Sequence, residues 1–192
     1  LLVARSDTDT GTKILEMIDW WRSYVAQNGA SLDNNPSPGN KRGGLTTILE
    51  KSLGAVAKGG LAPVSGAFAY AERIKTPGLV FMDSPGYDPV AATGQVASGA
   101  NLIAFTTGRG SCFGAKPVPS VKLASNSDLF HRMPEDMDIN CGTVVDEGLS
   151  LKKVGQFVYG RLLDIASGEA SKSEEFGYGD NEFVPWKIGA VL

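Results

Sequence analysis

Residues 78–114 read GLVFMDSPGYDPVAATGQVASGANLIAFTTGRGSCFG, which is the pattern of a strand, a helix and a second strand. The apolar run Leu79–Met82 is short enough for a strand buried on both faces, and it stops at a polar turn that begins with Asp83. Asp88 stands immediately before a proline, which is typical of a helix start. The apolar residues 102–105 form the second run. The pattern predicts two parallel strands of one sheet.

Polar residues follow each of these two strands. Asp83 and Ser84 come after the first strand, and Thr106, Thr107 and Arg109 come after the second. A right-handed crossover would place both strand ends at the same edge of the sheet, where open parallel sheets bind ligands. A carboxylate, three hydroxyls and a guanidinium suit a hydroxylated anionic substrate. The same residue types are common in ordinary turns, so both interpretations stay open.

The rest of the chain alternates helical and strand patterns. Helices are expected at 13–28, 45–58 and 151–166, a short helix at 127–133, and a third strand at 120–124. This order predicts an α/β fold, with a Rossmann-like parallel or mostly parallel sheet flanked by helices in a single domain. Trp20 and Trp21 lie on the first helix, where we expect core or interface contacts, and Trp186 is expected to anchor the C-terminal segment.

The polar loop at 30–44 separates the first two predicted helices. The amides of Asn34 and Asn40 can bind sugar hydroxyls, and Lys41 can bind a carboxylate or transfer a proton. Loops of this length inside a compact domain are often functional. A solvated surface loop is the alternative.

Several longer phrases resemble a known family. They are NPSPGNKRGGLTTILEKSLGAVAKGG, DSPGYDP, ATGQVASGANL, FTTGRGSCFGAKPVPSVKLASN, RMPEDMDINCG and SGEASKSEEFGYGDNEFVPWKIGAVL. These phrases are similar to the C-terminal region of the galactarate dehydratase/altronate dehydratase family. The resemblance implies a hydro-lyase that removes water from a sugar acid, such as D-galactarate or D-altronate, to give a 2-keto-3-deoxy sugar acid. The large subunit of sulfolactate sulfo-lyase is a related member that eliminates sulfite.

The resemblance also implies a larger protein. Family members are longer at the N-terminus and this chain does not begin with Met, so we expect residues 1–192 to be a C-terminal domain whose N-terminal part is absent. The expected partners are a sugar acid, the N-terminal domain of the same protein and further copies in a homo-oligomer. The fragment alone is expected to be inactive, and a noncatalytic scaffold domain is the alternative to a catalytic role.

Removal of water from a hydroxy acid needs a base, a cation that stabilises the enolate, and an acid or metal that helps hydroxide to leave. Asp83 or Lys41 could exchange the proton, and Arg109 and Lys41 are the cationic candidates. Asn140 is a further substrate-binding candidate. It lies two residues after Asp138, so in an extended segment the two side chains share a face.

A divalent metal, Fe²⁺ or another, is implied by the family resemblance. The candidate ligands in this chain are Asp88, Cys112 and Asp138. The only histidine, His131, has no second histidine with which to form a ligand pair. We therefore expect most ligands to lie in the absent N-terminal part.

Composition excludes some partners. The chain has 18 basic and 21 acidic residues and lacks a long basic run, so nucleic acid is not expected. It also lacks an apolar span of membrane length. Two cysteines in a chain of this size are expected to be free thiols in a reducing compartment, which favours the cytoplasm.

Overall fold

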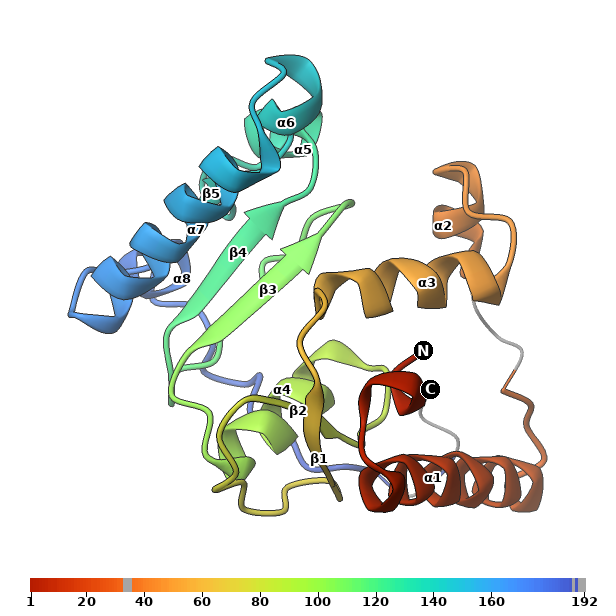
Figure 1. Ribbon diagram of the computed structural model, residues 1–192. Helices are drawn as coiled ribbons and strands as arrows, with labels where there is room; N and C mark the ends of the chain where they lie inside the picture. Colours follow the sequence, from red (N-terminus) through yellow and green to blue (C-terminus); the bar gives the residue numbers. More distant parts are fainter. Residues whose placement is uncertain (33–35, 188, 190–192) are drawn as a thin grey trace. The chain divides into compact units, whose positions relative to one another are not determined.

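The computed structural model describes residues 1–32, 36–187 and 189. The chain forms two compact units (Figure 1). Unit 1 contains Leu1–Tyr87 together with Trp186–Leu192, and unit 2 contains Asp88–Pro185. Each unit has its own parallel sheet.

Unit 1 is built on one long helix and a small sheet. Its elements in chain order are η1 (Val3–Arg5), α1 (Thr8–Gln27), α2 (Pro38–Arg42), α3 (Ile48–Lys58), β1 (Val64–Phe68) and β2 (Leu79–Met82). Helix α1 begins at Asp7, whose carboxylate accepts a hydrogen bond from the backbone N–H of Thr10 at 2.8 Å. Ile14 of α1 packs against Val64 of β1, so the apolar face of α1 covers this sheet.

Helix α3 carries apolar residues at helical spacing, a pattern that usually faces a core, but most of these residues are exposed. Thr47 and Glu50 form a capping box at its start, as its sequence indicates. Ile48, Leu49 and Leu53 are nevertheless 43%, 64% and 45% exposed. None of the residues of α3 is buried against the part of the chain that the structure describes. The capping box therefore accounts for where α3 begins, whereas its apolar side is not buried by the part of the chain that the structure describes.

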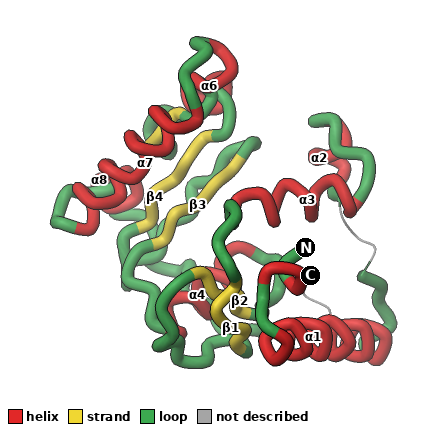
Figure 2. Tube along the Cα trace, in the orientation of Figure 1, coloured by secondary structure: helices red, strands yellow, loops and turns green. Residues whose placement is uncertain are grey.

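Unit 2 holds a three-stranded parallel sheet in the order β3-β4-β5. Figure 2 shows its strands β3 and β4 side by side. Its elements are α4 (Asp88–Ser98), β3 (Ile103–Thr107), β4 (Ser120–Ala124), α5 (Ser127–Arg132), β5 (Ile139–Asn140), α6 (Thr143–Asp146), α7 (Leu151–Ala166) and α8 (Lys172–Glu175). The central strand β4 is buried along its whole length. Helix α7 covers the sheet through Ile165, which packs against Val121.

The α/β class with parallel sheets flanked by helices is confirmed, but the predicted pairing inside residues 78–114 is wrong. Strand β2 pairs with β1, and β3 pairs with β4 in the other unit. A Rossmann-like sheet is therefore not confirmed. Strand β2 is also only partly buried, because it belongs to a sheet of two strands. The full burial expected there belongs to β4.

The C-terminal segment of unit 2 lies against the glycine-rich loop between β3 and β4. The backbone N–H of Gly114 donates to the carboxylate of Glu182 at 2.7 Å, and Lys116 pairs with Asp180. Gly179 has a φ of 107°, and a Cβ added there would lie 2.6 Å from the carbonyl oxygen of Gly114. The N–H of Gly114 is thus bound within the protein and is not presented to a ligand.

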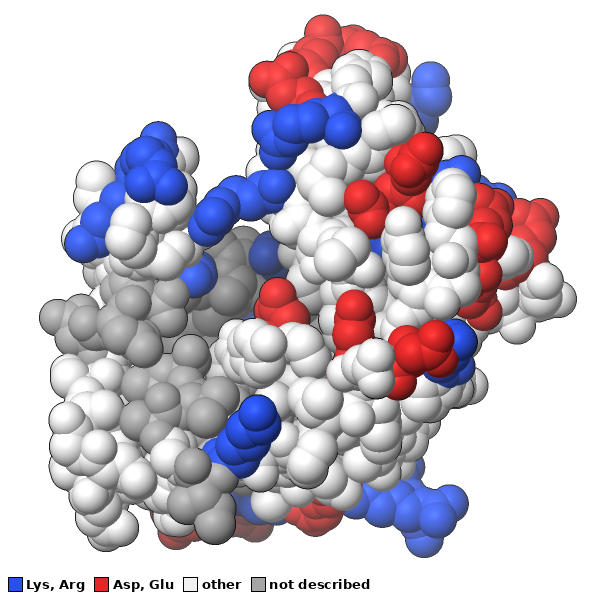
Figure 3. All heavy atoms as spheres, turned by 180° about the vertical axis from the view of Figure 1, so that it is seen from behind, with Lys and Arg blue, Asp and Glu red and all other residues white. Residues whose placement is uncertain are grey.

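Charged side chains of both signs are interspersed in small groups on the face drawn in Figure 3. Among the described residues, no helix combines the length and apolar character that a bilayer crossing requires.

Candidate functional site

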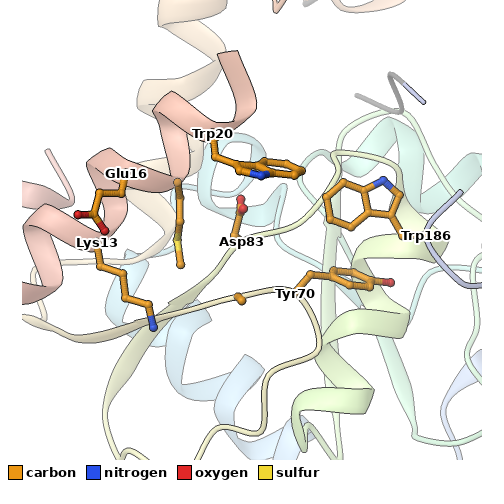
Figure 4. Close-up of a pocket in the computed structure, with 8 residues that line it drawn as sticks. Lys13, Glu16, Trp20, Tyr70, Asp83 and Trp186 are labelled. Carbon is orange, nitrogen blue, oxygen red and sulfur yellow. The ribbon is translucent and has the colours of Figure 1, made fainter. Parts of the chain in front are cut away.

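Asp83 lies just after the end of β2, in the wall of a cavity of about 550 Å³ in unit 1 (Figure 4). The backbone places it there, because its N–H donates to the carbonyl oxygen of Phe68 at 2.8 Å and so continues the β1–β2 ladder by one residue. The cavity residues labelled in Figure 4 are Lys13, Glu16, Trp20, Tyr70, Asp83 and Trp186. The first three belong to α1. Tyr70 follows β1, Asp83 follows β2, and Trp186 belongs to the C-terminal residues of unit 1.

Aromatic rings form much of this cavity. In Figure 4, Trp20 and Tyr70 lie on opposite sides of Asp83, and Trp186 stands beside them. The Trp186 ring meets both others edge to face, with centroids 5.9 Å from Trp20 and 5.3 Å from Tyr70. The rings give the cavity a largely apolar lining, to which Asp83 and Glu16 add carboxylates. This is the usual composition of a small-molecule site.

Trp21 fixes the Asp83 side chain. Its indole Nε1–H donates to Asp83 Oδ1 at 2.7 Å, and its ring stacks on Trp186 with centroids 5.2 Å apart and planes at 17°. Burial raises the pKa of Asp83 above its ordinary value of 3.8, while the hydrogen bonds from Trp21 and the Ser84 backbone act in the opposite direction. Asp83 is therefore a carboxyl group whose pKa is displaced towards neutral pH.

Lys13 supplies a positive charge to the same cavity. Its Nζ lies 3.7 Å from the Glu72 carboxylate and 5.5 Å from the centre of the Phe68 ring. Both Lys13 and Glu72 side chains are 44% exposed, so this ion pair is weak. The cavity thus combines a desolvated carboxylate, ring faces that can pack on carbon, and a loosely held cation. In such a cavity the carboxylate can remove a proton from a bound molecule that the cation and the rings hold in place.

The prediction that Asp83 and Arg109 share one sheet edge is wrong in its premise, because their strands belong to different sheets. Asp83 and Ser84 lie in unit 1. The Ser84 hydroxyl donates to the carbonyl oxygen of Pro85 at 3.1 Å. Arg109 lies in unit 2, beyond the carboxyl end of β3.

Arg109 and Asn140 do lie at one edge, that of the unit 2 sheet. Arg109 is exposed in the loop after β3, and Asn140 ends β5. The Asn126 amide, after β4, donates to the carbonyl oxygen of Gly108 at 3.0 Å and so holds this loop beside the neighbouring strand. The structure therefore places Asn140, a separate candidate, at the same sheet edge as Arg109, whereas Asp83 and Ser84 belong to the other unit.

Several predicted substrate-binding side chains are engaged in local structure. Thr107 Oγ1 accepts the backbone N–H groups of Arg109 at 3.3 Å and Gly110 at 3.1 Å. Asn140 Oδ1 accepts the N–H of Gly142 at 2.9 Å. Thr106, by contrast, is exposed at the end of β3.

In the polar loop before α3, one predicted site residue is engaged in local structure and another is exposed. Asn40 Oδ1 accepts from the Ser37 hydroxyl at 2.8 Å and forms the capping box of α2. Lys41 is exposed on the same helix. Asn34 lies outside the described residues.

The three candidate metal ligands do not form a metal centre in this part of the protein. Asp138 uses its two oxygens to accept the backbone N–H groups of Lys122 at 2.6 Å and Lys172 at 2.7 Å. Asp88 and Cys112 are exposed. Across residues 1–32, 36–187 and 189, no group of three His, Cys, Asp or Glu side chains could hold a metal ion. This donor set does not fit the implied Fe²⁺.

Sequence reasoning missed most of the aromatic cavity. We expected core or interface contacts for both helix tryptophans. Trp21 is 9% exposed and lies in the core, whereas Trp20 is 47% exposed and lines the cavity. The neighbouring tryptophans were the available signal, because consecutive residues on a helix point in different directions. Trp186 packs within unit 1, as an anchor should.

The chain is similar to known proteins over nearly its whole length. The family model described as D-galactarate/Altronate dehydratase, C-terminal, matches residues 1–191. Galactarate dehydratase (L-threo-forming) of Escherichia coli is 36% identical over 92% of this chain and 34% of its own length. Altronate dehydratase of Bacillus subtilis is 34% identical over 94% of this chain and 36% of its own length.

A relative whose name gives a different activity is also similar. The (2R)-sulfolactate sulfo-lyase subunit beta of Chromohalobacter salexigens is 32% identical over 96% of this chain and 48% of its own length. The chain thus spans between about a third and a half of the length of these curated relatives. Since the family model covers nearly every residue, the chain belongs to the D-galactarate/altronate dehydratase family and corresponds to its C-terminal region.

Proposed function

We propose that this chain is the C-terminal part of a hydro-lyase that removes water from a sugar acid, such as D-galactarate or D-altronate, to give a 2-keto-3-deoxy sugar acid. The observation that carries the proposal is the similarity to a galactarate dehydratase and an altronate dehydratase over more than nine-tenths of the chain. The remaining catalytic groups would come from the part of those longer proteins that this chain does not match. The two free cysteines support a cytoplasmic location.

In this proposal, Asp83 is the general base. Its ionised carboxylate takes the proton from the carbon beside the substrate carboxylate, and the C–H electron pair forms the enolate. The enolate electrons then form the C=C bond as the neighbouring C–O bond breaks. The protonated Asp83 gives its proton to the departing hydroxide, which forms water and returns Asp83 to its ionised form. The resulting enol becomes the keto acid by tautomerisation. Burial supports this role, because it raises the pKa of Asp83 above its ordinary value and so makes the carboxylate a stronger base.

Lys41, in the same unit as Asp83, is proposed as a cationic group that stabilises the enolate or assists the departing hydroxide. Arg109 is proposed as a catalytic cation at the sheet edge of unit 2, and this proposal does not depend on the cavity at Asp83. The side chains of Lys41 and Arg109 are both exposed. They are therefore accessible to a substrate or to another part of the protein. Thr106 and Asn140 lie near the same sheet edge as Arg109 and are proposed to bind substrate hydroxyls.

The divalent metal implied by the family is kept as a proposal with one restriction. The described residues provide no three-ligand group, so its ligands would come mainly from the unmatched part of the longer protein. When bound, such an ion would stabilise the enolate oxygen and the departing hydroxide.

The direct test is turnover of galactarate and altronate by the full-length protein with Fe²⁺, comparing wild type with Asp83→Asn. We expect Asp83→Asn to lower kcat at least 100-fold, because the amide cannot accept the proton. Asp19→Asn is the matched control, since that carboxylate lies on α1 with its side chain 72% exposed. Wild-type-like turnover by Asp83→Asn would exclude Asp83 as the base.

A sulfo-lyase subunit is the second candidate, and the similarity to the sulfolactate enzyme favours it. Release of sulfite from (2R)-sulfolactate, without turnover of sugar acids, would select it. A noncatalytic scaffold is the third possibility. It predicts that alanine at Asp83, Arg109 and Asn140 leaves turnover by the full-length protein intact.

A further inference from the structure

The hydrogen bond from Trp21 to Asp83 joins two distant parts of unit 1. Trp21 belongs to α1, whereas Asp83 follows β2, and the N–O distance is 2.7 Å. The bond lies beside the cavity that Asp83 lines. Resting on the proposed function, we propose that Trp21 is a positioning residue that orients the Asp83 carboxylate for proton abstraction and favours its ionised form.

The indole N–H suits this role because of its chemistry. It is a donor only, so it can hold a carboxylate oxygen but cannot take up the proton that the base removes. A hydrogen bond to a charged acceptor favours the charged form. Burial favours the neutral form, and the two effects act against each other on Asp83. Trp21 therefore limits how far burial raises the pKa of the base.

The Trp21 ring is itself held in place. Trp186 stacks on one side of it at 5.2 Å, and Trp20 meets it edge to face with centroids 5.3 Å apart. Because Trp21 is only 9% exposed, its ring has little space in which to turn. The direction of the N–H, and with it that of the carboxylate, is set by packing.

Other titratable groups face the same cavity and bear on the pH dependence. Lys13 and Glu16 reach it from α1, and Tyr70 reaches it from the segment after β1. Burial raises the pKa of Tyr70, which keeps this phenol neutral in the range where Asp83 titrates. Lys13 is paired with Glu72. None of these groups replaces the N–H that Trp21 directs at Asp83 Oδ1.

The test compares Trp21→Phe with Trp20→Phe. Each variant keeps an aromatic ring and loses an indole N–H, but only the N–H of Trp21 contacts Asp83. In the full-length enzyme, we expect Trp21→Phe to move the acidic limb of the kcat profile about one pH unit higher, which is the value of one hydrogen bond to a charged group. Trp20→Phe should leave that limb unmoved, whatever its effect on KM.

A second readout does not depend on turnover. The pKa of the Asp83 carboxyl group, followed by carbon-13 NMR in this chain, should rise by a similar amount in Trp21→Phe and stay constant in Trp20→Phe. Thermal unfolding of both variants measures the cost of altered packing. If Trp21→Phe lowers stability but moves neither the acidic limb nor the Asp83 titration, Trp21 is a packing residue only. Equal shifts in both variants would also overturn the proposal.

These outcomes separate the two proposals. Absence of turnover of any sugar acid by the wild-type protein would reject the dehydratase function. The NMR titration would still decide whether Trp21 controls Asp83. Turnover that depends on Asp83, together with an unshifted titration in Trp21→Phe, would reject the role of Trp21 alone.

Discussion

Trp186, near the C-terminal end of the chain, stacks on Trp21 of α1, with ring centroids 5.2 Å apart and planes at 17°. Stacked aromatic pairs contribute about 0.5–1.5 kcal/mol beyond the area that they bury. The contact ties the C-terminal residues of unit 1 to its longest helix and completes one wall of the cavity at Asp83. Trp186 is therefore part of the candidate site.

Replacement of Trp186 by alanine should weaken unit 1. The variant loses the stack on Trp21 and the edge contacts with Trp20 and Tyr70, so we expect the free energy of unfolding to fall by about 2 kcal/mol. Urea denaturation followed by circular dichroism measures this loss. Phe183→Ala is the control, because that ring is 49% exposed. An equal loss in both variants would show that the stack contributes little.

Asp138 is expected to be structural. Asp138→Ala leaves the N–H groups of Lys122 and Lys172 without their carboxylate partner, so unfolding should become easier by about 3 kcal/mol. Glu135→Ala, at an exposed neighbouring position, should change stability little. If Asp138 were instead a metal ligand, Asp138→Ala would lower the free energy of unfolding of the iron-loaded protein and not that of the metal-free protein. If metal-free Asp138→Ala is as stable as the metal-free wild type but binds iron more weakly, the structural role of Asp138 is contradicted.

Lys122 should make stability depend on alkaline pH. The side chain is fully buried, and its ammonium donates to the carbonyl oxygen of Phe113 at 2.9 Å. Burial lowers the pKa of Lys122 below 10.5, against the attraction of Asp138 and other nearby groups. At a pH between the pKa of Lys122 in the folded protein and its higher pKa in the unfolded chain, the unfolded chain binds more protons than the folded protein. The contribution of Lys122 to the free energy of unfolding therefore increases as the pH rises through this range.

Lys122→Met should remove that contribution, because methionine keeps an unbranched side chain without a charge. The difference in unfolding free energy between wild type and Lys122→Met, measured in urea from pH 7 to pH 10.5, should increase in favour of wild type as pH rises. A constant difference over this range would show that Lys122 has an ordinary pKa in the folded protein.

The two thiols should react at different rates. Cys112 is exposed, whereas Cys141 is partly buried and burial raises its pKa. A disulfide reagent at pH 8 should therefore modify one thiol rapidly and the second at least tenfold more slowly. Cys112→Ser should abolish the rapid phase, and Cys141→Ser should retain it. Retention of the rapid phase in Cys112→Ser would reverse the assignment.

Elements with strong local signals could be predicted from sequence. Ser150 caps α7 by accepting from the N–H of Lys153, and Asn126 caps α5 in the same manner. The strand expected at 120–124 is the central strand β4. In each case the information lies within a few residues of the element, where capping and hydrophobic spacing act.

Strand pairing could not be predicted in the same way. The strand–helix–strand pattern at 78–114 is real, but it does not specify the partner of either strand. The partner of β2 is β1, whose residues Ser65, Gly66 and Ala67 lack the β-branched or aromatic character of a typical strand. Long-range packing selected this pairing, and sequence pattern alone does not report it.

The site shows the same limit. Asp83 was identifiable because a carboxylate directly after a buried-type strand is a common ligand position. Trp20 and Trp186 were not, since their contact depends on bringing distant segments of the chain together. The remaining catalytic assignments, including Lys41 and Arg109, stay predictions.

The chain has three tryptophans, and all of them lie in the cluster around Asp83 in unit 1. Indole emission is consequently an optical signal from unit 1 alone, while ellipticity comes from the helices of both units. If the two units melt as a single cooperative block, the emission and ellipticity transitions will superimpose. If they melt separately, the two curves will diverge without any introduced dye or label.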